Sequence, residues 1–507
     1  MTAIGRGLHS EWTKFRTVRG WAWGMVAALL AVVIVGLIGT AASNPNGAGA
    51  LPVGPGGEAV NDSFYFVHQS LDGDGSIVAE VTSLTGEVAA GGPRSGETPG
   101  LAPWAKAGII VKQSLTQGSS YAAMMVTAAH GVRMQYDYTR DAPGLAGRVS
   151  AGSPRWLRLT RTGDIVTGYD SVNGTSWTKV GAARLSGLSP EVEVGMFTTT
   201  PQATAATSTG PGMIPAVATG AFDRVALSGQ WQDRQPAGDS WTGTQIGRDA
   251  GTSGSYLGNG SGEYTSSGGT FTLTGAGDIA PVVGGSAFAS GREIENFLVG
   301  GFAGLIVVIV IATGFMTAEY RRGLLGLTLA ATPRRGRVLA AKAAVLGLAA
   351  FAVGVVAALV AIPIGERESA ANGFAVATVP LATEVRVMLG TGLLLAAASV
   401  FALAVGTIVR RSAVAITIPV AGLVLPYILA TSGILPDGAG DWLLRVSPAA
   451  GFAIQQSLRY YPQVDSTYNP SSGYFPLSPW GGFAVLCGYT AVAFAVAVIL
   501  LRRRDAA

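Results

Sequence analysis

Six stretches of about twenty residues that contain no Asp, Glu, Lys, Arg or His constrain this 507-residue chain more than any other feature. A helix rises about 1.5 Å per residue, so about 20 apolar residues span the roughly 30 Å hydrocarbon core of a bilayer. The predicted spans are residues 21–42, 297–318, 343–364, 387–409, 413–435 and 480–501. The sequence therefore predicts an α-helical membrane bundle of six transmembrane helices.

The basic residues that border these stretches predict the orientation of the chain. Cytoplasmic loops carry an excess of Lys and Arg over short external loops. With both termini inside, the inner segments hold fifteen such residues and the short outer loops hold four. The inner set is Arg6, Lys14, Arg16, Arg19, Arg321, Arg322, Arg334, Arg335, Arg337, Lys342, Arg410, Arg411, Arg502, Arg503 and Arg504, and the outer set is Arg367, Arg386, Arg445 and Arg459. We therefore expect a plasma-membrane protein with cytoplasmic termini, a cytoplasmic tail at 502–507, and residues 43–295 extracellular.

Residues 1–20 are predicted to form an amphipathic helix at the inner membrane interface. Leu8, Trp12 and Phe15 follow helical spacing, and we expect them to face lipid. The first span differs from a secretory signal, whose apolar region is about 7–15 residues long. We therefore expect the first span to remain as an anchor.

Between the first two spans the apolar stretches give way to alternating apolar and polar residues with turn residues between them, a pattern typical of β-strands. The predicted strands are residues 77–81, 108–112, 121–127, 132–138, 156–161, 165–169, 191–198 and 221–227. So many short strands pack economically as an all-β sandwich, expected here over about residues 60–228.

Residues 229–290 are rich in Gly, Ser and Thr and predict a looser extension, with one further strand at 270–274. The pair Asn173-Gly174 predicts a tight hairpin turn, because a two-residue turn of this type favours positive φ at both positions.

Few residues of this insert suggest chemistry. His68 and His130 have no neighbours at metal-ligand spacing, so we expect no metal site. Trp104, Trp156 and Trp177 are candidates for a ligand groove, although a buried core is the more usual place for such large rings. The chain has one cysteine, Cys487, so no disulfide forms within it.

Three segments beside the predicted spans carry recognisable motifs. They are SEWTKFRTVR at residues 10–19, the stretch from TAEYRRG at 317–323 through LTLAATPRR at 327–335 to AAK at 340–342, and SPAAGF at 447–452. Together these segments resemble actinobacterial type-2 ABC exporter permeases. The insert contains PWAKAGI at 103–109, RWLRL at 155–159 and GMF at 195–197. On these segments it resembles the concanavalin-like (LamG-like jelly-roll) sandwich modules of bacterial glycan-related proteins. Most permeases of this family have a short first external loop, so the insert is a departure from the family pattern.

The resemblance implies the permease subunit of an ATP-driven exporter, with an ABC ATPase subunit and a second permease copy as partners. The chain has no Gly-rich phosphate loop ending in Gly-Lys-Ser/Thr, so it is not expected to be an enzyme or to bind a cofactor itself. ATP and Mg²⁺ would be bound by the partner ATPase. The residues expected to couple the two subunits are Glu11, Lys14, Glu319, Tyr320, Arg321, Arg322, Arg334 and Arg335.

Spans without a carboxylate or histidine argue against coupling to a proton or sodium gradient and favour a lipid-like or amphipathic cargo. The alternative is a membrane-anchored extracellular protein that binds glycan or senses a signal without transport. Six spans exceed what an anchor requires.

Overall fold

The structure is a computed structural model, and it describes a large part of the chain. The described residues are 3–41, 51–89, 97–207, 210–233, 241–247, 262–283, 291–321, 323, 335–372, 374–432, 435, 438–464, 468 and 474–503. The chain divides into a helical unit and a β-unit. The helical unit comprises Met1–Ala50, Gly284–Arg459 and Thr467–Ala507, and the β-unit comprises Leu51–Val283 and Tyr460–Ser466.

The helical unit contains six helices that are long and apolar enough to cross a membrane. They are α2 (Arg19–Ala41), α4 (Gly301–Arg321), α6 (Arg335–Ala371), α7 (Leu381–Val409), α8 (Ser412–Thr431) and α10 (Pro479–Arg503). Each contains or overlaps one of the six predicted spans, and the set is compatible with a multi-pass membrane protein. Shorter elements accompany them: α1 (Ala3–Thr17), η1 (Ile294–Leu298), the strands β20 (Gly291–Arg292) and β21 (Ala375–Val376), α9 (Ala439–Val446) and η2 (Pro448–Gln455).

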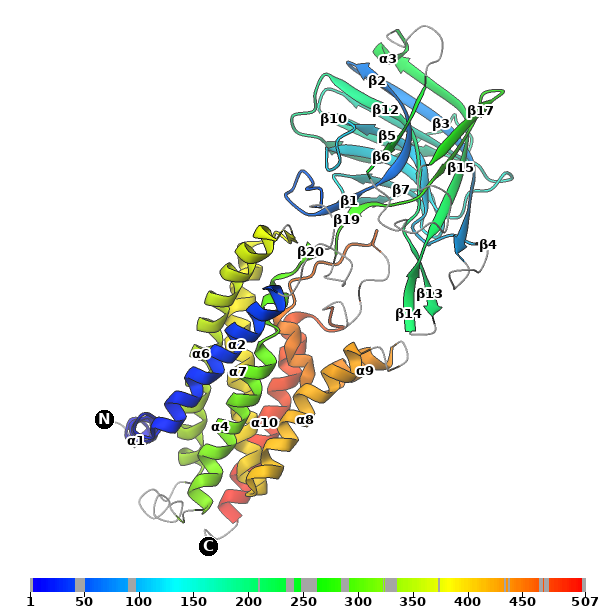
Figure 1. The fold of residues 1–507 in the computed structure, drawn as a ribbon. Helices are drawn as coiled ribbons and strands as arrows, with labels where there is room; N and C mark the ends of the chain where they lie inside the picture. The colour runs from blue at the N-terminus through cyan, green and yellow to red at the C-terminus, as the bar shows by residue number, and fades with distance from the viewer. Residues whose placement is uncertain are drawn as a thin grey trace. The chain divides into compact units, whose positions relative to one another are not determined.

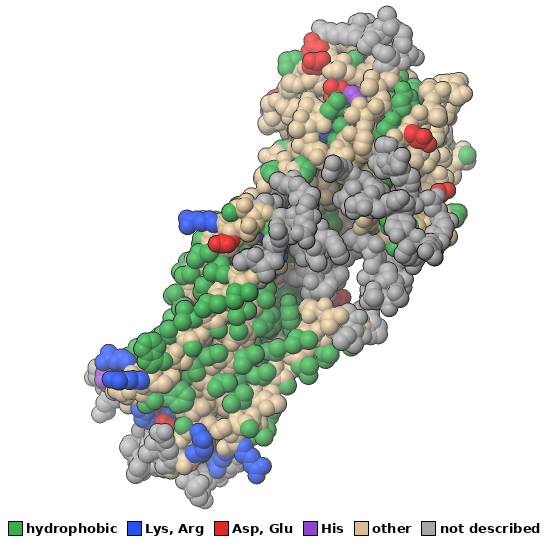
Figure 2. All heavy atoms as spheres, viewed as in Figure 1, with side chains coloured by type: hydrophobic (Ala, Val, Ile, Leu, Met, Phe, Trp, Pro, Cys, Tyr) green, Lys and Arg blue, Asp and Glu red, His purple; other side chains and the backbone are tan. Residues whose placement is uncertain are grey.

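Helices α4 and α7 form the centre of the helical unit. Their most apolar segments are 61% and 72% buried, whereas those of α2 and α10 are each 22% buried. Close packing of α6 against α7 depends on glycine, because a Cβ added to Gly354 would lie 2.7 Å from Cα of Gly392. The apolar side chains left exposed on the outer helices suit contact with lipid (Figure 2).

Helix α1 and the C-terminal end of α10 lie at the same end of the helical unit (Figure 1). Lys and Arg side chains gather at this end in the view of Figure 2. We call it the terminal end of the helical unit.

The β-unit is a β-sandwich-like pair of sheets. The eight-stranded sheet has the order β11-β10-β9-β3-β15-β18-β17, and β4 pairs with β3 off this path. Its strands are β3 (Gly75–Ala89), β4 (Glu97–Pro99), β9 (Arg155–Thr162), β10 (Ile165–Ser171), β11 (Thr178–Arg184), β15 (Ala216–Gly229), β17 (Glu263–Ser267) and β18 (Thr270–Gly275).

The second sheet has seven strands in the order β16-β2-β12-β5-β6-β7-β8. They are β2 (Phe64–Asp72), β5 (Lys106–Lys112), β6 (Tyr121–Thr127), β7 (Gly131–Tyr136), β8 (Arg140–Pro143), β12 (Glu191–Thr199) and β16 (Thr242–Ile246). Two short pairs, β1 (Val60–Asp62) with β19 (Ile279–Pro281) and β13 (Ala203–Thr207) with β14 (Gly210–Ile214), and the single turn α3 (Gln230–Asp233) complete the unit.

Alternation along the strands builds the core between the sheets. On β9, Leu157 and Leu159 are buried in a cluster that includes Val67 and Ile109 of the other sheet. Side chains at even positions of β9 therefore point outward. The seven-stranded sheet buries a second apolar layer on its outward face, with Phe64, Phe66, Ile110, Tyr121 and Phe197 among its members.

The sandwich extends beyond the predicted boundary at residue 228. The predicted strand at 270–274 corresponds to β18, but β16, β17 and β19 also come from the segment expected to be a loose extension. The Gly, Ser and Thr residues of this segment give no strand pattern in the sequence, and the strands form because of tertiary contacts. For example, Tyr264 packs on the core and donates a hydrogen bond to the carbonyl of Trp241 at 2.9 Å.

The predicted hairpin at Asn173-Gly174 joins β10 to β11, but the connection is longer than two residues. Gly174 has a φ of +73°, whereas Asn173 is not among the residues with positive φ. The Asn173 side chain instead accepts hydrogen bonds from the backbone N–H groups of Thr175 and Ser176, which is an Asx-type turn.

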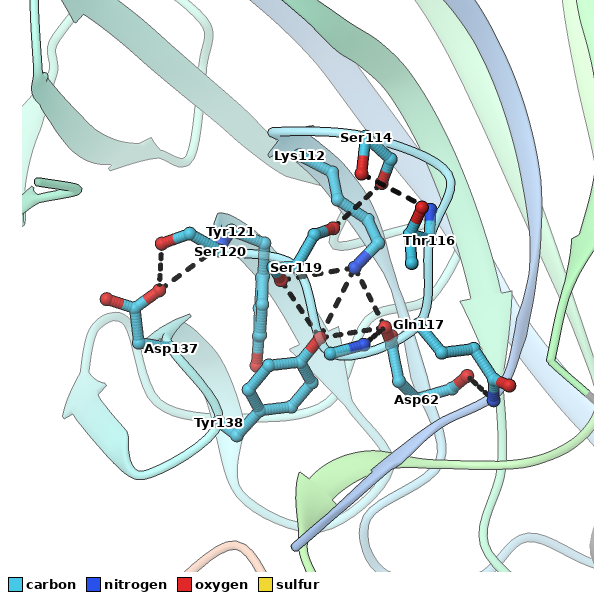
Figure 3. A network of polar contacts seen from close by, with 11 residues as sticks. Asp62, Lys112, Ser114, Thr116, Gln117, Ser119, Ser120, Tyr121, Asp137 and Tyr138 are labelled. Atoms are coloured by element: carbon cyan, nitrogen blue, oxygen red, sulfur yellow. Dashed lines mark hydrogen bonds and ion pairs between the residues drawn. The ribbon is translucent and has the colours of Figure 1, made fainter. Parts of the chain in front are cut away.

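Buried ion pairs hold the first and last strands of the β-unit on the seven-stranded sheet. Oδ2 of Asp62 on β1 accepts hydrogen bonds from Lys112 Nζ at 2.8 Å, Tyr138 Oη at 2.7 Å and the Gly118 N–H at 2.8 Å (Figure 3). The side chains of Asp62 and Lys112 are both fully buried. Beside β19, Lys106 Nζ donates to Oδ1 of Asp278 at 2.8 Å.

This environment shifts the titration of the groups around Asp62. Burial lowers the pKa of Lys112, although the charge of Asp62 opposes that effect. Burial, together with the negative charge of Asp62, raises the pKa of Tyr138. Tyr138 therefore remains a neutral hydrogen-bond donor to Asp62.

Candidate functional site

The terminal end of the helical unit contains a buried cluster of two lysines and two glutamates. Lys342 Nζ lies 2.7 Å from Oε2 of Glu11 and 2.6 Å from Oε1 of Glu319. Lys14 Nζ lies 2.8 Å from Oε1 of Glu11 and 3.4 Å from Oε1 of Glu319. The four charges balance, and together they join α1, α4 and α6. We call these four residues the charge cluster.

Burial makes the charge cluster costly to break. The side chain of Lys342 is fully buried, that of Glu11 is 3% exposed, and the Lys342 ammonium lies 4.6 Å from the centroid of the Phe315 ring. Charges removed from water are tolerated when each is paired and hydrogen-bonded. The cluster therefore fixes α1 to the ends of α4 and α6.

Lys14 occupies the outer edge of the cluster and is 40% exposed. Burial by itself would lower the pKa of Lys14, but the hydrogen bond and charge of Glu11 and the charge of Glu319 outweigh it. The pKa of Lys14 therefore lies above its ordinary value, and the lysine stays charged.

The sequence of α1 places Glu11 toward the bundle, and this corrects the expectation that Leu8 and Phe15 face lipid. Phe15 is 5% exposed and packs against Phe315 with ring centroids 6.2 Å apart, and Leu8 also packs on the helical core. Trp12 remains 44% exposed. Because Glu11 pairs with Lys342, the neighbouring apolar residues on its side of α1 turn inward with it.

The other predicted coupling residues lie around helix ends. The Tyr320 ring lies 4.9 Å from the guanidinium carbon of Arg410 at the end of α7. Arg335 Nη1 donates to the carbonyl of Leu501 on α10 at 2.8 Å. Arg321 is exposed at the end of α4. Arg322 and Arg334 lie outside the described residues.

Lys342 belongs to the charge cluster but is not among the predicted coupling residues. Its signal in the sequence is a single lysine, seven residues into α6, that directly precedes the charge-free stretch. A charge so close to a long apolar run either reaches the membrane surface or pairs inside the protein. The structure shows the second outcome.

A second polar cluster lies where η1 meets the segment after η2. The carboxylate of Glu295 accepts hydrogen bonds from the N–H of Ser457 at 3.0 Å and from its hydroxyl. Burial raises the pKa of Glu295. Arg386 on α7 donates to the carbonyls of Ile454 and Gln456 at 3.3 and 2.7 Å. These contacts fix the segment between α9 and α10 to the bundle.

The structure does not bring the three predicted groove tryptophans onto one face. Trp104 is buried beside the seven-stranded sheet, stacked on His130 with ring centroids 4.1 Å apart and covered by Arg133 at 5.7 Å. Trp156 points outward from the eight-stranded sheet under Arg224 at 5.5 Å.

The third predicted tryptophan, Trp177, packs on the same outward face as Trp156. Its ring lies 4.5 Å from the guanidinium carbon of Arg158, which also lies 4.3 Å from the ring of Tyr169. Arg224 and Arg158 therefore cover the rings of Trp156 and Trp177, which a ligand would have to contact in a groove.

No protein-family profile matches the chain, and no curated protein sequence matches it. Several solved structures align with part of it. Scytalido-glutamic peptidase with a transition-state analogue inhibitor is 11% identical, over 44% of this chain and 100% of that one, with a TM-score of 0.26. SCP-B, a peptidase of the Eqolisin family in complex with the tripeptide Ala-Ile-His, is 11% identical over the same shares, with a TM-score of 0.23. Lectin I-B4 from Griffonia simplicifolia, in its metal-free form, is 12% identical over 36% of this chain and 87% of that one, with a TM-score of 0.17. At such low TM-scores these similarities carry no inference about fold or chemistry.

Proposed function

We propose that this chain is the transmembrane permease subunit of an ATP-driven exporter and that it couples to a separate ATPase subunit. The charge cluster is the observation that carries the proposal. It ties α1, which lies alongside the ends of the spans, to both α4 and α6. A displacement of α1, or of the chain between α4 and α6, would therefore move the candidate spans α4 and α6 together.

The surroundings of the cluster support a coupling role. Arg410 covers Tyr320, and Arg335 is bound to α10, so the residues that flank the chain between α4 and α6 also contact α7 and α10. A partner that binds this segment would thus act on four of the six candidate spans. In the proposed topology this end faces the cytoplasm, where an ATPase subunit has access to ATP and Mg²⁺.

The proposal also assigns the β-unit, as a concanavalin-like domain inserted between the first two spans, to the outside of the cell. Its strands follow α2 and precede α4 in the chain. Glycan binding without transport remains the alternative assignment, but the separate positions of Trp104 and Trp156 do not favour it.

The orientation is tested by cysteine labelling in a Cys487→Ser background. Thr175→Cys, in the exposed loop between β10 and β11, is expected to react with a membrane-impermeant maleimide on intact cells. Arg321→Cys, at the exposed end of α4, is expected to react only after permeabilisation. Labelling of both positions on intact cells would exclude the proposed topology.

The exporter assignment is tested by isolating the full-length protein from its native membrane in mild detergent. An ATPase subunit is expected to co-purify, and its hydrolysis rate is expected to change when amphipathic cargo candidates are added. A preparation that contains only this chain, under conditions that preserve known permease–ATPase complexes, would favour the anchored glycan-binding alternative.

A further inference from the structure

The outward face of the seven-stranded sheet carries a hydroxyl, an imidazole and a carboxylate in one hydrogen-bonded chain. His68 Nε2 lies 3.0 Å from Oγ1 of Thr244, and His68 Nδ1 lies 2.6 Å from Oε2 of Glu193. The three residues stand on the adjacent strands β16, β2 and β12. They are separate from both the charge cluster and the buried network around Asp62.

The strand register explains why these side chains meet. His68 pairs with Thr242 on β16 and with Gly195 on β12. Thr244 and Glu193 are each two positions from those partners, so both lie on the same face as His68. Gly195 has no side chain to separate the imidazole from Glu193. Phe66 stacks on the imidazole with centroids 4.7 Å apart and holds its plane.

We propose that Thr244, His68 and Glu193 form a catalytic triad that hydrolyses carboxylic esters. A hydroxyl is a weak nucleophile until a neighbouring base takes its proton, and that base is effective when a third group orients it. In this arrangement Thr244 is the nucleophile, His68 is the base, and Glu193 fixes the tautomer of His68 and stabilises its protonated form.

The reaction balances with water as the only co-reactant. Oγ1 of Thr244 bonds to the ester carbonyl carbon, and its proton passes to Nε2 of His68. The bond between the carbonyl carbon and the alkoxy oxygen then breaks, and the proton passes from His68 to that oxygen. An alcohol leaves, and an acyl-threonine remains at position 244. Water attacks the acyl carbon, its proton passes to His68 and on to Thr244, and the carboxylic acid is released.

The surroundings define the class of substrate. Thr244 is half-buried. The next hydrogen-bonded pair along the same face, Ser70 and Glu191, is exposed, so a substrate reaches the triad from the side of this pair. Glu191 and Glu193 make this region negative, and Lys112, which is in register with Glu193, is neutralised by Asp62 instead. The substrate is therefore a neutral or cationic ester.

In the proposed reaction, backbone N–H groups of strand β16 would be the donors to the oxyanion that forms during attack. Strand β16 is the edge strand of the seven-stranded sheet among the described strands. Alternate N–H groups of an edge strand point away from the sheet and have no ladder partner. Such backbone donors stabilise a developing oxyanion when they lie next to the nucleophile.

The test uses the full-length protein in detergent with two probes, a fluorophosphonate and 4-nitrophenyl acetate. The fluorophosphonate is expected to label Thr244, as mapped by mass spectrometry of the digested protein. His68→Gln keeps a hydrogen bond to Glu193 but cannot accept the proton, and it is expected to lower ester hydrolysis by about 100-fold or more. Thr244→Val is expected to abolish labelling.

Two further variants keep the result interpretable. Thr244→Ser keeps the hydroxyl and relieves crowding, so labelling and hydrolysis are expected to persist. Ser70→Ala removes a nearby hydroxyl that bonds to Glu191 rather than to a histidine, and it is expected to leave both unchanged. The proposal is overturned if neither the natural protein nor Thr244→Ser is labelled at position 244. It is also overturned if the His68 and Thr244 variants change only the melting temperature, which would make the three residues a clamp for β16.

Discussion

Lys342→Met is expected to destabilise the helical unit by about 3–5 kcal/mol, because removing one partner leaves buried charge without compensation. Glu11 and Glu319 would then share only Lys14, which contacts Glu319 at the longer distance of 3.4 Å. The expected observations are a lower melting temperature in detergent and faster proteolysis within α1. If the proposed function is correct, cargo-dependent ATP hydrolysis by the complex is lost as well.

Lys14→Met is the matched control, because Lys14 contacts the same two carboxylates from an exposed position. Exposed ion pairs contribute about 0–1 kcal/mol, so this variant is expected to be nearly as stable as the natural protein. The exchange Glu11→Lys with Lys342→Glu keeps one buried pair of opposite charge and is expected to recover part of the loss. Equal effects of Lys342→Met and Lys14→Met would show that burial does not set the strength of the cluster.

Asp62→Asn is expected to destabilise the β-unit by about 3–5 kcal/mol, because Lys112 would be left as a fully buried cation without a counter-charge. The asparagine carbonyl still accepts hydrogen bonds from Tyr138 and Gly118, so the change reports on charge rather than on shape. The measurement is the proteolysis rate of the β-unit in the full-length protein against temperature. Lys112→Met, which leaves the Asp62 carboxylate unpaired, is expected to have an effect of similar size.

The double variant Asp62→Asn with Lys112→Met is expected to recover most of the stability, since replacing both members of a buried pair is often nearly neutral. Arg224→Ala is the exposed control. Its partner Glu80 lies 3.5 Å away and Arg224 is 73% exposed, so a loss of about 0–1 kcal/mol is expected. A double variant as unstable as the two single variants combined would show that Asp62 and Lys112 act independently.

The sequence predicted those parts of the fold that local pattern determines. The charge-free run at 387–409 lies within α7, and the predicted strand at 121–127 has the bounds of β6. Both runs are almost wholly apolar, and every residue of β6 is buried, so the composition of each run is enough to indicate an element kept from water. The helix α6 begins at Arg335, before the predicted span at 343, because Val338, Leu339 and Lys342 in its first turns are buried against other parts of the helical unit.

The parts that the sequence did not predict depend on residues far apart in the chain. Lys342 meets Glu11 across 331 positions, and His68 meets Glu193 across 125. No spacing rule links such residues, because only the packed helices and the strand register bring them together. Strand β16 was missed for the same reason, since its Gly and Thr residues form a strand only when β2 provides hydrogen-bonding partners.

The pairing of β1 with β19 brings together the two ends of the segment Leu51–Val283 of the β-unit. Val60 is paired with Pro281, so the two ends of the β-unit lie one strand spacing apart, about 4.5–5.5 Å between Cα atoms. A domain with adjacent ends can be spliced into a short loop of a host protein without forcing the host's flanking segments apart. Helices α2 and α4 can therefore pack against each other although Leu51–Val283 lies between them in the chain.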